Sequence, residues 1–451
     1  MAENSLHTIF FISLGCDKNL VDSEIMIGLL RQAGFELVTD ESEAEVIVVN
    51  TCSFVCDARD ESIQTLIEMG RMKEEGRCRV LIAAGCLAER YKDEILTEMP
   101  EVDGVVGTAS YQHIAELVKQ TLGGRREEVF EDVNGLPQPD VDRAVQTGSC
   151  SSYLKIAEGC DKHCSYCIIP SLRGHYRSYP MDYLVRQARK LAEQGIRELN
   201  LVAQETTVYG TDIYGKKMLP ELLRRLCRID GLEWIRILYC YPEEITQELL
   251  ETIRDEDKIC DYLDLPIQHA SDRILKLMGR RTNHDDLVSI IRKAREIVPD
   301  ICLRTTLISG FPAETEEDHQ ILKDFVREQK FDRLGVFCYS REDGTRAALM
   351  EGQIDEAVKE RRRGELMEIQ QDIVFEKNRS MEGRQLEVLI EGRIPEDDVY
   401  VGRTRRDAPD VDGYIFLDYD GSLMSGDIVP ALVTGARDYD LTGDVMDEFT
   451  E

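Results

Sequence analysis

The sequence predicts an α/β protein made of an open parallel sheet, a partial (βα)6 barrel and a small antiparallel β-barrel at the carboxyl end. Three observations predict this architecture. Apolar runs rich in Val and Ile alternate with helix-patterned segments in the first part of the chain. Six further strand-helix alternations follow from about residue 153, and short strands with Gly and Asp turns come last.

The first part contains three apolar runs that each finish on a cysteine. HTIFFISLGC ends at Cys16, AEVIVVNTC at Cys52 and RVLIAAGC at Cys86, and residues 22–33 and 60–74 are patterned as crossover helices. Ligands of open parallel sheets bind beyond the carboxyl ends of the strands, so we expect the three cysteines along one edge. One buried cysteine would mean little, but three at corresponding strand ends favour a shared metal site.

The middle part carries six strand candidates in a row. They read YLKIAEG, RELNLVAQ, WIRILYC, YLDLPIQ, ICLRTTLI and RLGVFCY, and helix-patterned stretches such as 182–194 and 315–329 separate them. Six βα units predict a parallel barrel, complete or partial. Residues 355–380 then read as one long charged helix, after which the pattern changes to short strands typical of a small barrel.

These changes of pattern predict the domain limits. Residues 5–123 form the first domain and residues 150–378 the barrel domain, and residues 379–447 form the last. Between the first two, residues 124–149 lose periodicity and gather Gly, Pro and Asp, which indicates a linker.

Three cysteines follow the first barrel strand in the stretch EGCDKHCSYC. The spacing C-x3-C-x2-C of Cys160, Cys164 and Cys167 places three thiolates where barrel active sites assemble. A structural zinc site would need a fourth ligand, which His163 or His175 could supply, but such sites commonly pair two C-x2-C knuckles. The other interpretation is a 4Fe-4S cluster held through three irons, with the fourth open to a substrate or cofactor.

This spacing, with Tyr166 before the last cysteine, resembles the radical S-adenosylmethionine (SAM) superfamily. The resemblance implies that Cys160, Cys164 and Cys167 hold a 4Fe-4S cluster whose open iron chelates SAM. In that superfamily one electron from the reduced cluster cleaves SAM, and the resulting deoxyadenosyl radical abstracts hydrogen from an unreactive carbon.

Around the first three cysteines the sequence resembles the methylthiotransferase family. The matching stretches are LGCDKNLVDSE, NTCSF and AGCLAER, and the domain order agrees as well. The resemblance implies a second 4Fe-4S cluster on Cys16, Cys52 and Cys86, a radical SAM barrel and a carboxy-terminal TRAM domain. In the family one SAM methylates a sulfur attached to the amino-terminal cluster, and a second SAM gives the radical that activates the target carbon.

Further candidates lie at the ends of later barrel strands. The superfamily resemblance implies that Gln204, Glu205 and Arg304 hold the polar ends of SAM and that Gly310 and Pro312 flank its adenosine. The stretch SGFPAET can equally be ordinary strand-to-helix turn chemistry, since Glu314 with Thr315 suits a helix start.

Some candidate residues have a simpler interpretation. His269 in IQHAS either faces the cavity or is a hydrogen-bonded packing residue. The remaining cysteines complete no ligand spacing and read as buried or free thiols; they are Cys56, Cys78, Cys150, Cys227, Cys240, Cys260, Cys302 and Cys338. No catalytic residue beyond the cluster ligands and SAM contacts is indicated.

Composition limits the partners. No apolar stretch approaches a membrane span, and the first residues lack a basic leader, so we expect a cytoplasmic protein without a membrane partner. Fourteen cysteines in such a chain argue for metal binding rather than a disulfide scaffold. A formal net charge of −32 repels nucleic acid and attracts basic proteins.

Members of the family differ in their targets. One branch modifies adenosines of transfer RNA, and another modifies the β-carbon of an aspartate of small-subunit ribosomal protein S12. Lys18 in SLGCDKNLVDSE resembles the ribosomal protein branch, since the transfer RNA enzymes typically carry Gln at that place. Residues 381–451 hold 18 acidic and 6 basic side chains, the wrong sign for gripping RNA, although an acidic surface can also serve solubility alone.

Two alternatives stay open beside the ribosomal protein target. A transfer RNA enzyme needs a basic path, which Arg403, Arg405 and Arg406 suggest only weakly, because they could equally pair with acidic residues of their own turn, namely Asp407, Asp410 and Asp412. A non-catalytic scaffold would use the clusters structurally and would not cleave SAM. The reaction also implies an electron donor and a sulfur source, which the sequence does not identify.

Overall fold

The computed structural model describes residues 7–145, 149–396 and 398–446, so the predicted domain limits at 5 and 447 lie outside the described residues. Contacts divide the chain into two compact units. The described part of the first comprises residues 7–145, 155–179 and 340–348, and that of the second comprises residues 149–154, 180–339 and 349–446. The cysteine-rich stretch after the first barrel strand therefore belongs to the same unit as the amino-terminal sheet.

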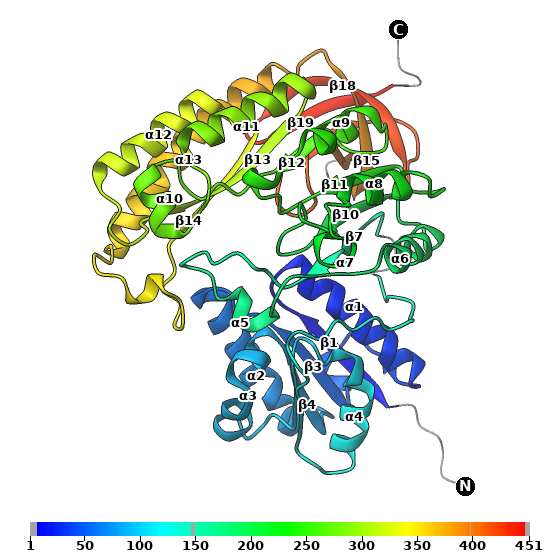
Figure 1. The fold of residues 1–451 in the computed structure, drawn as a ribbon. Coiled ribbons are helices and arrows are strands. Elements are labelled where there is room, and N and C mark those ends of the chain that lie inside the picture. The colour runs from blue at the N-terminus through cyan, green and yellow to red at the C-terminus, as the bar shows by residue number, and fades with distance from the viewer. Residues whose placement is uncertain (1–6, 146–148, 397, 447–451) are drawn as a thin grey trace. The chain divides into compact units, whose positions relative to one another are not determined.

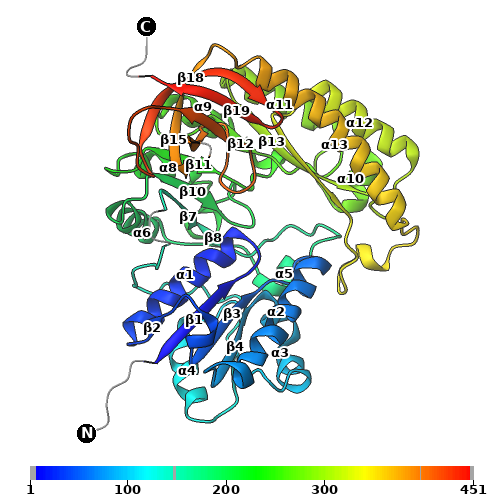
Figure 2. The ribbon, with the colours of Figure 1, turned by 180° about the vertical axis from the view of Figure 1, so that it is seen from behind.

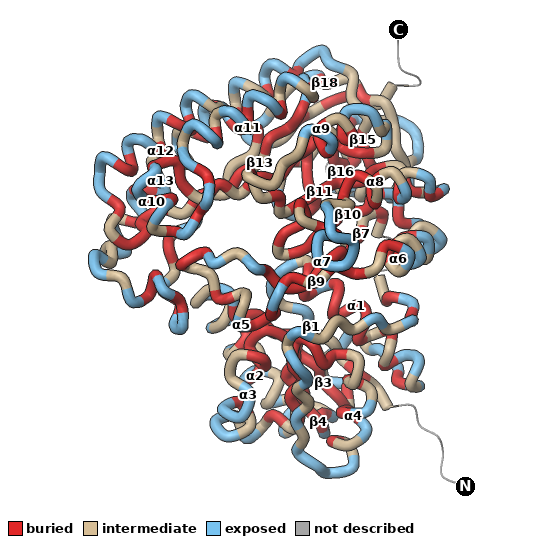
Figure 3. The backbone as a smooth tube through the Cα atoms, viewed as in Figure 1, coloured by how far each residue is buried: buried red, intermediate tan, exposed pale blue. Residues whose placement is uncertain are grey.

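The first unit is built on a six-stranded parallel sheet in the order β2-β1-β3-β4-β5-β6. Its strands are β1 (Thr8–Ser13), β2 (Glu36–Leu37), β3 (Val46–Thr51), β4 (Val80–Gly85), β5 (Gly104–Val106) and β6 (Glu127–Val129). The two central strands, VIVVNT and VLIAAG, are buried along their whole length, as the red tube of Figure 3 shows. Apolar runs without alternation are what a sheet covered on both faces requires, so the predicted open α/β sheet is confirmed.

Helices cover both faces of this sheet. They are α1 (Asp17–Gln32), α2 (Cys56–Glu75), α3 (Cys86–Glu98) and α4 (Ile114–Leu122), with single 3-10 turns at Glu41–Glu43 and Tyr111–His113. In Figures 1 and 2, α2 and α3 lie on one face of the sheet, and α1 and α4 lie on the other.

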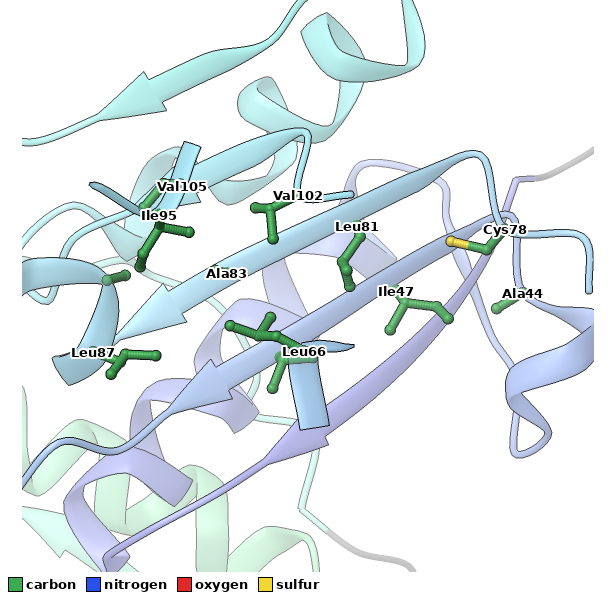
Figure 4. Packing of buried hydrophobic residues seen from close by; sticks show 12 residues of the cluster. Ala44, Ile47, Leu66, Cys78, Leu81, Ala83, Leu87, Ile95, Val102 and Val105 are labelled. Atoms are coloured by element: carbon green, nitrogen blue, oxygen red, sulfur yellow. The ribbon is translucent and has the colours of Figure 1, made fainter. Parts of the chain in front are cut away.

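The core between the sheet and α2 and α3 is entirely apolar at its centre. Figure 4 shows Ile47 of β3 and Leu81 of β4 beside Leu66 of α2, with Leu87 and Ile95 of α3 nearby. A buried aliphatic side chain of this kind contributes about 1.5–3 kcal/mol. The packing against α2 and α3 thus supports, on one face of the sheet, the strands that precede the three cysteines.

The segment at 124–149, which the sequence suggests is a linker, supplies part of the first unit. Its β6 is the last strand of the sheet, and Arg143 is buried against Glu24 of α1, with 3.0 Å between Nε and Oε2. The unit also contains β8 (Ala157–Glu158), β9 (Arg177–Ser178) and α5 (Ile169–Arg173).

The second unit contains the predicted barrel. Its strands form two three-stranded sheets in the orders β11-β10-β7 and β12-β13-β14, and a parallel bridge between Ile235 and Ile259 adjoins them. The strands are β7 (Ser151–Lys155), β10 (Glu198–Val202), β11 (Trp234–Ile237), β12 (Tyr262–Asp264), β13 (Cys302–Ser309) and β14 (Arg333–Cys338). All six predicted strands are present, and the partial (βα)6 barrel is confirmed.

Helices follow these strands in the expected alternation. They are α6 (Met181–Glu193), α7 (Thr211–Tyr214), α8 (Leu219–Cys227), α9 (Gln247–Asp255), α10 (Asp272–Met278), α11 (His284–Ile297), α12 (Glu316–Gln329) and α13 (Glu356–Arg379), with 3-10 turns at Pro242–Glu244 and Ala347–Leu349. The start of α12 is a capping box in which the side chains of Thr315 and Asp318 each accept a backbone N–H of the other residue. The long charged helix is α13, which lies beside α12 (Figure 2).

The chain ends in a closed five-stranded barrel in the order β15-β16-β17-β19-β18. Its strands are β15 (Gln385–Ile394), β16 (Val399–Thr404), β17 (Ile415–Asp418), β18 (Ile428–Arg437) and β19 (Asp440–Val445). The pairing of β17 with β19 is parallel, and the other pairings are antiparallel. Within the described ranges, no helix has both the length and the apolar character needed to cross a bilayer.

Candidate functional site

The amino-terminal cysteines lie at the ends of three adjacent strands, as predicted. Cys52 directly follows β3, Cys86 directly follows β4 and begins α3, and Cys16 follows β1 after a two-residue turn. Because β1, β3 and β4 are parallel neighbours, the three thiols share one edge of the sheet. Cys16 raises the pKa of Cys52, and Cys16 and Cys52 both raise the pKa of Cys86, so the three thiols lie close together.

Two of these thiols, Cys52 and Cys86, are buried, and Cys16 is exposed. Burial raises the pKa of Cys86 to about 12 and also raises the pKa of Cys52, and the positive charge of Arg173 partly offsets both effects. Cys52 and Cys86 are therefore neutral thiols when no metal is bound, and a bound iron would have to displace their protons. Three thiols are a donor set that suits a soft metal centre.

The second set of cysteines lies in the loop between β8 and α5, also in the first unit. The backbone N–H of Cys167 donates to the carbonyl of Cys164 (3.2 Å), and the N–H of Lys162 points at the sulfur of Cys160 (3.4 Å). Burial, together with the neighbouring Cys164 and Cys160, raises the pKa of Cys167 to about 12. The loop therefore gathers the three thiols in one place.

Neither set has the spacing of ligands to one metal ion. Among the described residues, no group of three or more His, Cys, Asp or Glu side chains is arranged to hold a single ion. In a cluster each thiolate binds its own iron, so its ligands do not need to converge on one point. His175, proposed as a possible zinc ligand, has its Nδ1 hydrogen-bonded to Asp161 at 3.0 Å.

A packing contact connects the two cysteine sets inside the first unit. Cys86 packs in one apolar cluster with Ile168 and Leu172, and Ile168 directly follows Cys167 in the chain. The hydroxyl of Thr108 donates to the carbonyl of Leu172 at 2.8 Å. The sequence predicted each set separately, but the structure joins them through the residues of α5.

A buried polar network that the sequence does not predict lies beside this contact. Arg173 of α5 donates to Asn19 (2.6 Å) and Asp22 (2.7 Å), both from α1, and to the sulfur of Cys86 (3.6 Å). Asn19 and Asp22 lie in the motif LGCDKNLVDSE, but nothing in the spacing marks Arg173 as their partner. A charge buried by distant segments leaves no local periodic signal.

The segment 340–348 also packs against the second cysteine loop. The N–H of Ala347 donates to the carbonyl of Ser165 (2.8 Å), and Glu342 pairs with Arg90 of α3 (3.0 Å). The thiol of Cys56 donates to the other oxygen of Glu342 at 3.2 Å, which fits its expected role as an ordinary thiol.

The predicted SAM residues belong to the second unit. Gln204 and Glu205 come after β10, separated from it by Ala203, and the buried Glu205 accepts a hydrogen bond from Thr207 at 2.9 Å. Gly310 follows β13 with φ +71°, and its N–H donates to Glu314 at 2.7 Å. Burial raises the pKa of Glu314 to about 7.

The turn that contains Gly310 and Pro312 is tightly enclosed. A Cβ on Gly310 would lie 2.2 Å from Cγ of Lys359, whose Nζ is anchored on the carbonyl of Tyr339 at 2.8 Å. Pro312 itself is buried. The backbone of this turn is therefore fixed before any ligand arrives.

Arg304 already has two carboxylate partners. Its guanidinium lies 3.0 Å from Asp264 and 3.5 Å from Asp412, and these charges hold its pKa above the usual value although burial opposes them. A contact of Arg304 with SAM stays a prediction, and it would have to share the guanidinium with these carboxylates. His269 is fully buried; its Nδ1 accepts the N–H of Ser271 (2.9 Å), whereas its buried Nε2 has no hydrogen-bond partner among the described residues.

The arginines of the carboxy-terminal turn point into the second unit. Arg403 pairs with Glu198 of β10 and Glu391 of β15, Arg405 pairs with Glu387 (3.1 Å), and Arg406 pairs with Asp332 (2.7 Å). The expectation that they pair with the acidic residues of their own turn is wrong. They are also not displayed as a basic path, because their charges are neutralised by these partners.

A cavity of about 520 Å³ lies in the second unit where Trp234 and Arg405 meet. Charges of both signs line it, three cations (Arg197, Lys258 and Arg405) and four carboxylates (Glu233, Asp257, Glu387 and Asp427). None of the predicted cluster or SAM residues belongs to its lining.

Comparisons with known proteins agree with this architecture. Sequence profiles match the uncharacterized protein family UPF0004 over residues 8–107, the Radical SAM superfamily over 154–326 and the TRAM domain over 383–446. Among solved structures, the radical SAM methyltransferase TsrM from Kitasatospora setae is similar in fold, with a TM-score of 0.55 at 16% identity over 74% of this chain and 73% of that one. The cobalamin-dependent SAM radical enzyme OxsB gives a TM-score of 0.52 at 15% identity, over 76% of this chain and 55% of that one.

The curated relatives match over almost their full lengths. The ribosomal protein uS12 methylthiotransferase RimO of Lachnoclostridium phytofermentans is 61% identical over 96% of this chain and 99% of its own. The protein of the same name from Clostridioides difficile is 49% identical over 97% of this chain and 98% of its own. At this identity and coverage, and with both cysteine sets in place, the chain belongs to the RimO family of radical SAM methylthiotransferases.

Proposed function

We propose that this chain adds a methylthio group to the β-carbon of an aspartate in ribosomal protein uS12, the S12 protein of the small subunit. The proposal is supported by relatives of that name at 61% and 49% identity over nearly the whole chain. It agrees with the presence of a radical SAM barrel and a TRAM domain.

One observation of the structure carries the proposal: the two cysteine sets lie in one compact unit. Cys86 of the first set packs against Ile168, which directly follows Cys167 of the second set, and against Leu172 of α5. Methylthio transfer requires that a sulfur carrier and a radical source act on the same carbon. Holding two reactive centres in one rigid unit lowers the entropic part of such a barrier.

The residues present fit two 4Fe-4S clusters. Cys16, Cys52 and Cys86 offer three thiols to one, and Cys160, Cys164 and Cys167 offer three to the other, so each would keep an open iron. When bound, the clusters and SAM supply the methylthio group and the carbon-centred radical. The chain's own part is to hold the sulfur ligands in surroundings from which water is largely excluded.

The predicted SAM contacts are part of the proposal. Gln204 and Glu205 at the end of β10 would hold polar groups of SAM, with Arg304 as a further candidate, and the turn with Gly310 and Pro312 would flank the adenosine. The fixed backbone of that turn supports its role, because a preformed surface loses little freedom on binding.

The charge of the carboxy-terminal domain favours a basic protein over RNA. Its 18 acidic residues outnumber 6 basic ones, and the three arginines of the turn at 403–406 are paired within the second unit. Binding a phosphate backbone normally needs several accessible cations. We therefore place uS12 ahead of a modified adenosine of transfer RNA as the target.

The proposed reaction implies further partners and a place. It needs an electron donor for the cluster of Cys160, Cys164 and Cys167, and a sulfur source for the other cluster. The substrate is either free uS12 or the protein on the small subunit. An enzyme with this substrate works where ribosomes assemble, so we propose a cytoplasmic location.

The experiment that tests the target is mass spectrometry of uS12 and of total transfer RNA from cells with and without the gene. We expect a methylthio group to disappear from one aspartate of uS12, while transfer RNA stays unchanged. Loss from a modified adenosine, with uS12 unchanged, would establish the transfer RNA alternative instead.

The experiment that tests the chemistry is anaerobic reconstitution with iron and sulfide. We expect about eight irons per chain, falling by about half in Cys52→Ala and in Cys160→Ala. Reduced protein should cleave SAM, and Cys160→Ala should not. A chain that binds iron but leaves SAM intact would support a non-catalytic scaffold.

A further inference from the structure

The polar network beside Cys86 contains hydrogen-bond donors that do not take part in its ion pairs. Two buried cations, Lys155 and Arg173, face two buried carboxylates, Asp22 and Glu158. These four charges balance, so a cation of any shape at 173 would satisfy the carboxylates. The hydrogen bonds that Arg173 sends elsewhere therefore need a different explanation.

Those additional bonds all go to the amino-terminal cysteine edge. Nη1 of Arg173 serves Asp22 (2.7 Å) and Glu158 (3.3 Å), whereas Nη2 serves Asn19 (2.6 Å) and the sulfur of Cys86 (3.6 Å). The planar fork of a guanidinium can make both sets of contacts at once, and the single ammonium of a lysine cannot. The network is thus specific for arginine on its cysteine side.

Asn19 connects Arg173 by hydrogen bonds to the loops of the other two cysteines. Its amide nitrogen donates to the carbonyl of Leu14 (3.0 Å), two residues before Cys16, and to the carbonyl of Thr51 (2.8 Å), just before Cys52. These bonds orient the amide so that its oxygen accepts from Arg173. One guanidinium is therefore connected to all three cysteine loops, through Asn19 to two and directly to the third.

Arg173 is also attached to the radical SAM loop. It lies in α5, six positions after Cys167, and Ile168 and Leu172 of the same segment pack against Cys86. Glu158, which it shares with Lys155, precedes Cys160 by two positions. Arg173 thus stands between the two cysteine sets with bonds to both sides.

We propose that Arg173 is a positioning residue of the amino-terminal cluster: it fixes the cysteine edge against the radical SAM loop and donates a hydrogen bond to the sulfur of Cys86. The inference rests on the proposed function for the presence of that cluster. Hydrogen bonds to ligand sulfurs stabilise the reduced cluster and raise its reduction potential. Arg173 therefore sets the potential and the iron retention of the amino-terminal cluster.

The test uses the full chain with Cys160, Cys164 and Cys167 changed to alanine, so that only the amino-terminal cluster is reconstituted. In this parent we compare Arg173→Gln and Arg173→Lys by potentiometric titration followed by electron paramagnetic resonance. Both variants should shift the potential to more negative values, because both lose the bond to Cys86. Arg173→Lys keeps the cation for Asp22 and Glu158, so it decides the test if Arg173→Gln does not fold.

The matched control is Lys155→Met. It removes a cation from the same network, and in the described part of the chain Lys155 bonds Asp22 and Glu158 and lies over Tyr111 without a hydrogen bond to a cysteine. We expect this variant to lose unfolding stability but to keep the parent potential. Iron release to a chelator should be about tenfold faster in Arg173→Lys than in the parent.

The outcomes separate this inference from the proposed function. A parent that holds about four irons, with an unchanged potential and unchanged iron release in Arg173→Lys, would overturn the role of Arg173 alone. An equal shift in Lys155→Met and Arg173→Lys would also overturn it, because the network would then act by net charge without a specific bond. A parent that binds no iron would overturn the amino-terminal cluster and this inference together.

Discussion

Gly15 lies directly against the side chain of Cys52. A Cβ on Gly15 would stand 2.6 Å from Cβ and 2.8 Å from Sγ of Cys52, and the backbone of Gly15 has φ +87°. The loop of the first cysteine therefore packs onto the second without room for a methyl group. This close approach makes the position a sensitive test of the amino-terminal cluster.

We expect Gly15→Ala to lose the amino-terminal cluster and to keep the other. After reconstitution the variant should hold about four irons per chain, half of the parent value. Gly34→Ala is the matched control, since Gly34 has φ +88° in the same unit and nothing within 4 Å of its Cβ position. Gly34→Ala introduces the same backbone strain, about 1–2 kcal/mol, but no steric contact with a neighbouring side chain. Equal iron content in both variants would contradict the explanation.

We expect Gly310→Ala to weaken SAM binding at least about tenfold, a loss of about 1.4 kcal/mol or more. The new methyl group would meet Cγ of the anchored Lys359 at 2.2 Å, so the turn has to move. Equilibrium dialysis with reconstituted protein measures the affinity. Gly215→Ala, at φ +70° with nothing within 4 Å, should bind SAM like the parent.

We expect Glu198→Gln to destabilise the second unit by about 3–5 kcal/mol, because two fully buried cations, Arg236 and Arg403, would lose their shared carboxylate. Urea unfolding measures the loss. Glu233→Gln is the control, since the pair of Glu233 with Arg197 is about half exposed at 3.6 Å and contributes less than about 1 kcal/mol. Similar losses of unfolding free energy in the two variants would mean that the buried ion pairs of Glu198 stabilise the fold no more than an exposed pair does.

The same carboxylate gives an acid dependence. Burial raises the pKa of Glu198, but Arg403 and Arg236 outweigh it and lower the pKa to about 2. Its stabilisation is therefore complete above the unfolded value near 4.5 and is lost as the pH falls towards 2.

We expect His269→Gln to reduce the pH dependence of unfolding between pH 6.5 and 5. Burial lowers the pKa of His269 to about 3, so the folded state keeps it neutral while the unfolded chain binds a proton below 6.5. Stability is then present above the unfolded pKa and falls by about 1 kcal/mol per pH unit below it. His113→Gln, at an exposed pair with Glu131, is the control. An unchanged slope in His269→Gln would contradict the assignment.

The sequence was sufficient where a local pattern has one structural meaning. Runs such as VIVVNT and VLIAAG could only be buried parallel strands, and their terminal Cys52 and Cys86 therefore had to share an edge. The six barrel strands and the long α13 were predicted for the same reason. The capping box of Thr315 and Asp318 is also a local signal.

The sequence was insufficient where distant charges meet. Arg173 finds Asn19 and Asp22 more than a hundred positions away, and Arg403 finds Glu198 across a separation of 205 residues. Such pairs follow from tertiary packing and leave no periodicity. Residues 124–149, rich in Pro and Gly, predict a linker, and the short edge strand β6 and the buried Arg143 within them leave no periodic signal in the sequence.

The pairing of Arg403 with Glu198 also has a consequence for synthesis on the ribosome. Glu198 and Arg236 emerge early, but the second cation of Glu198 is made 205 residues after it, which takes about 10–40 s. Until then Glu198, in the interior of the parallel barrel, lacks the second of its two cations, Arg403. The second unit therefore completes its folding only when the carboxy-terminal barrel has been translated, and chaperones have that interval in which to act on it.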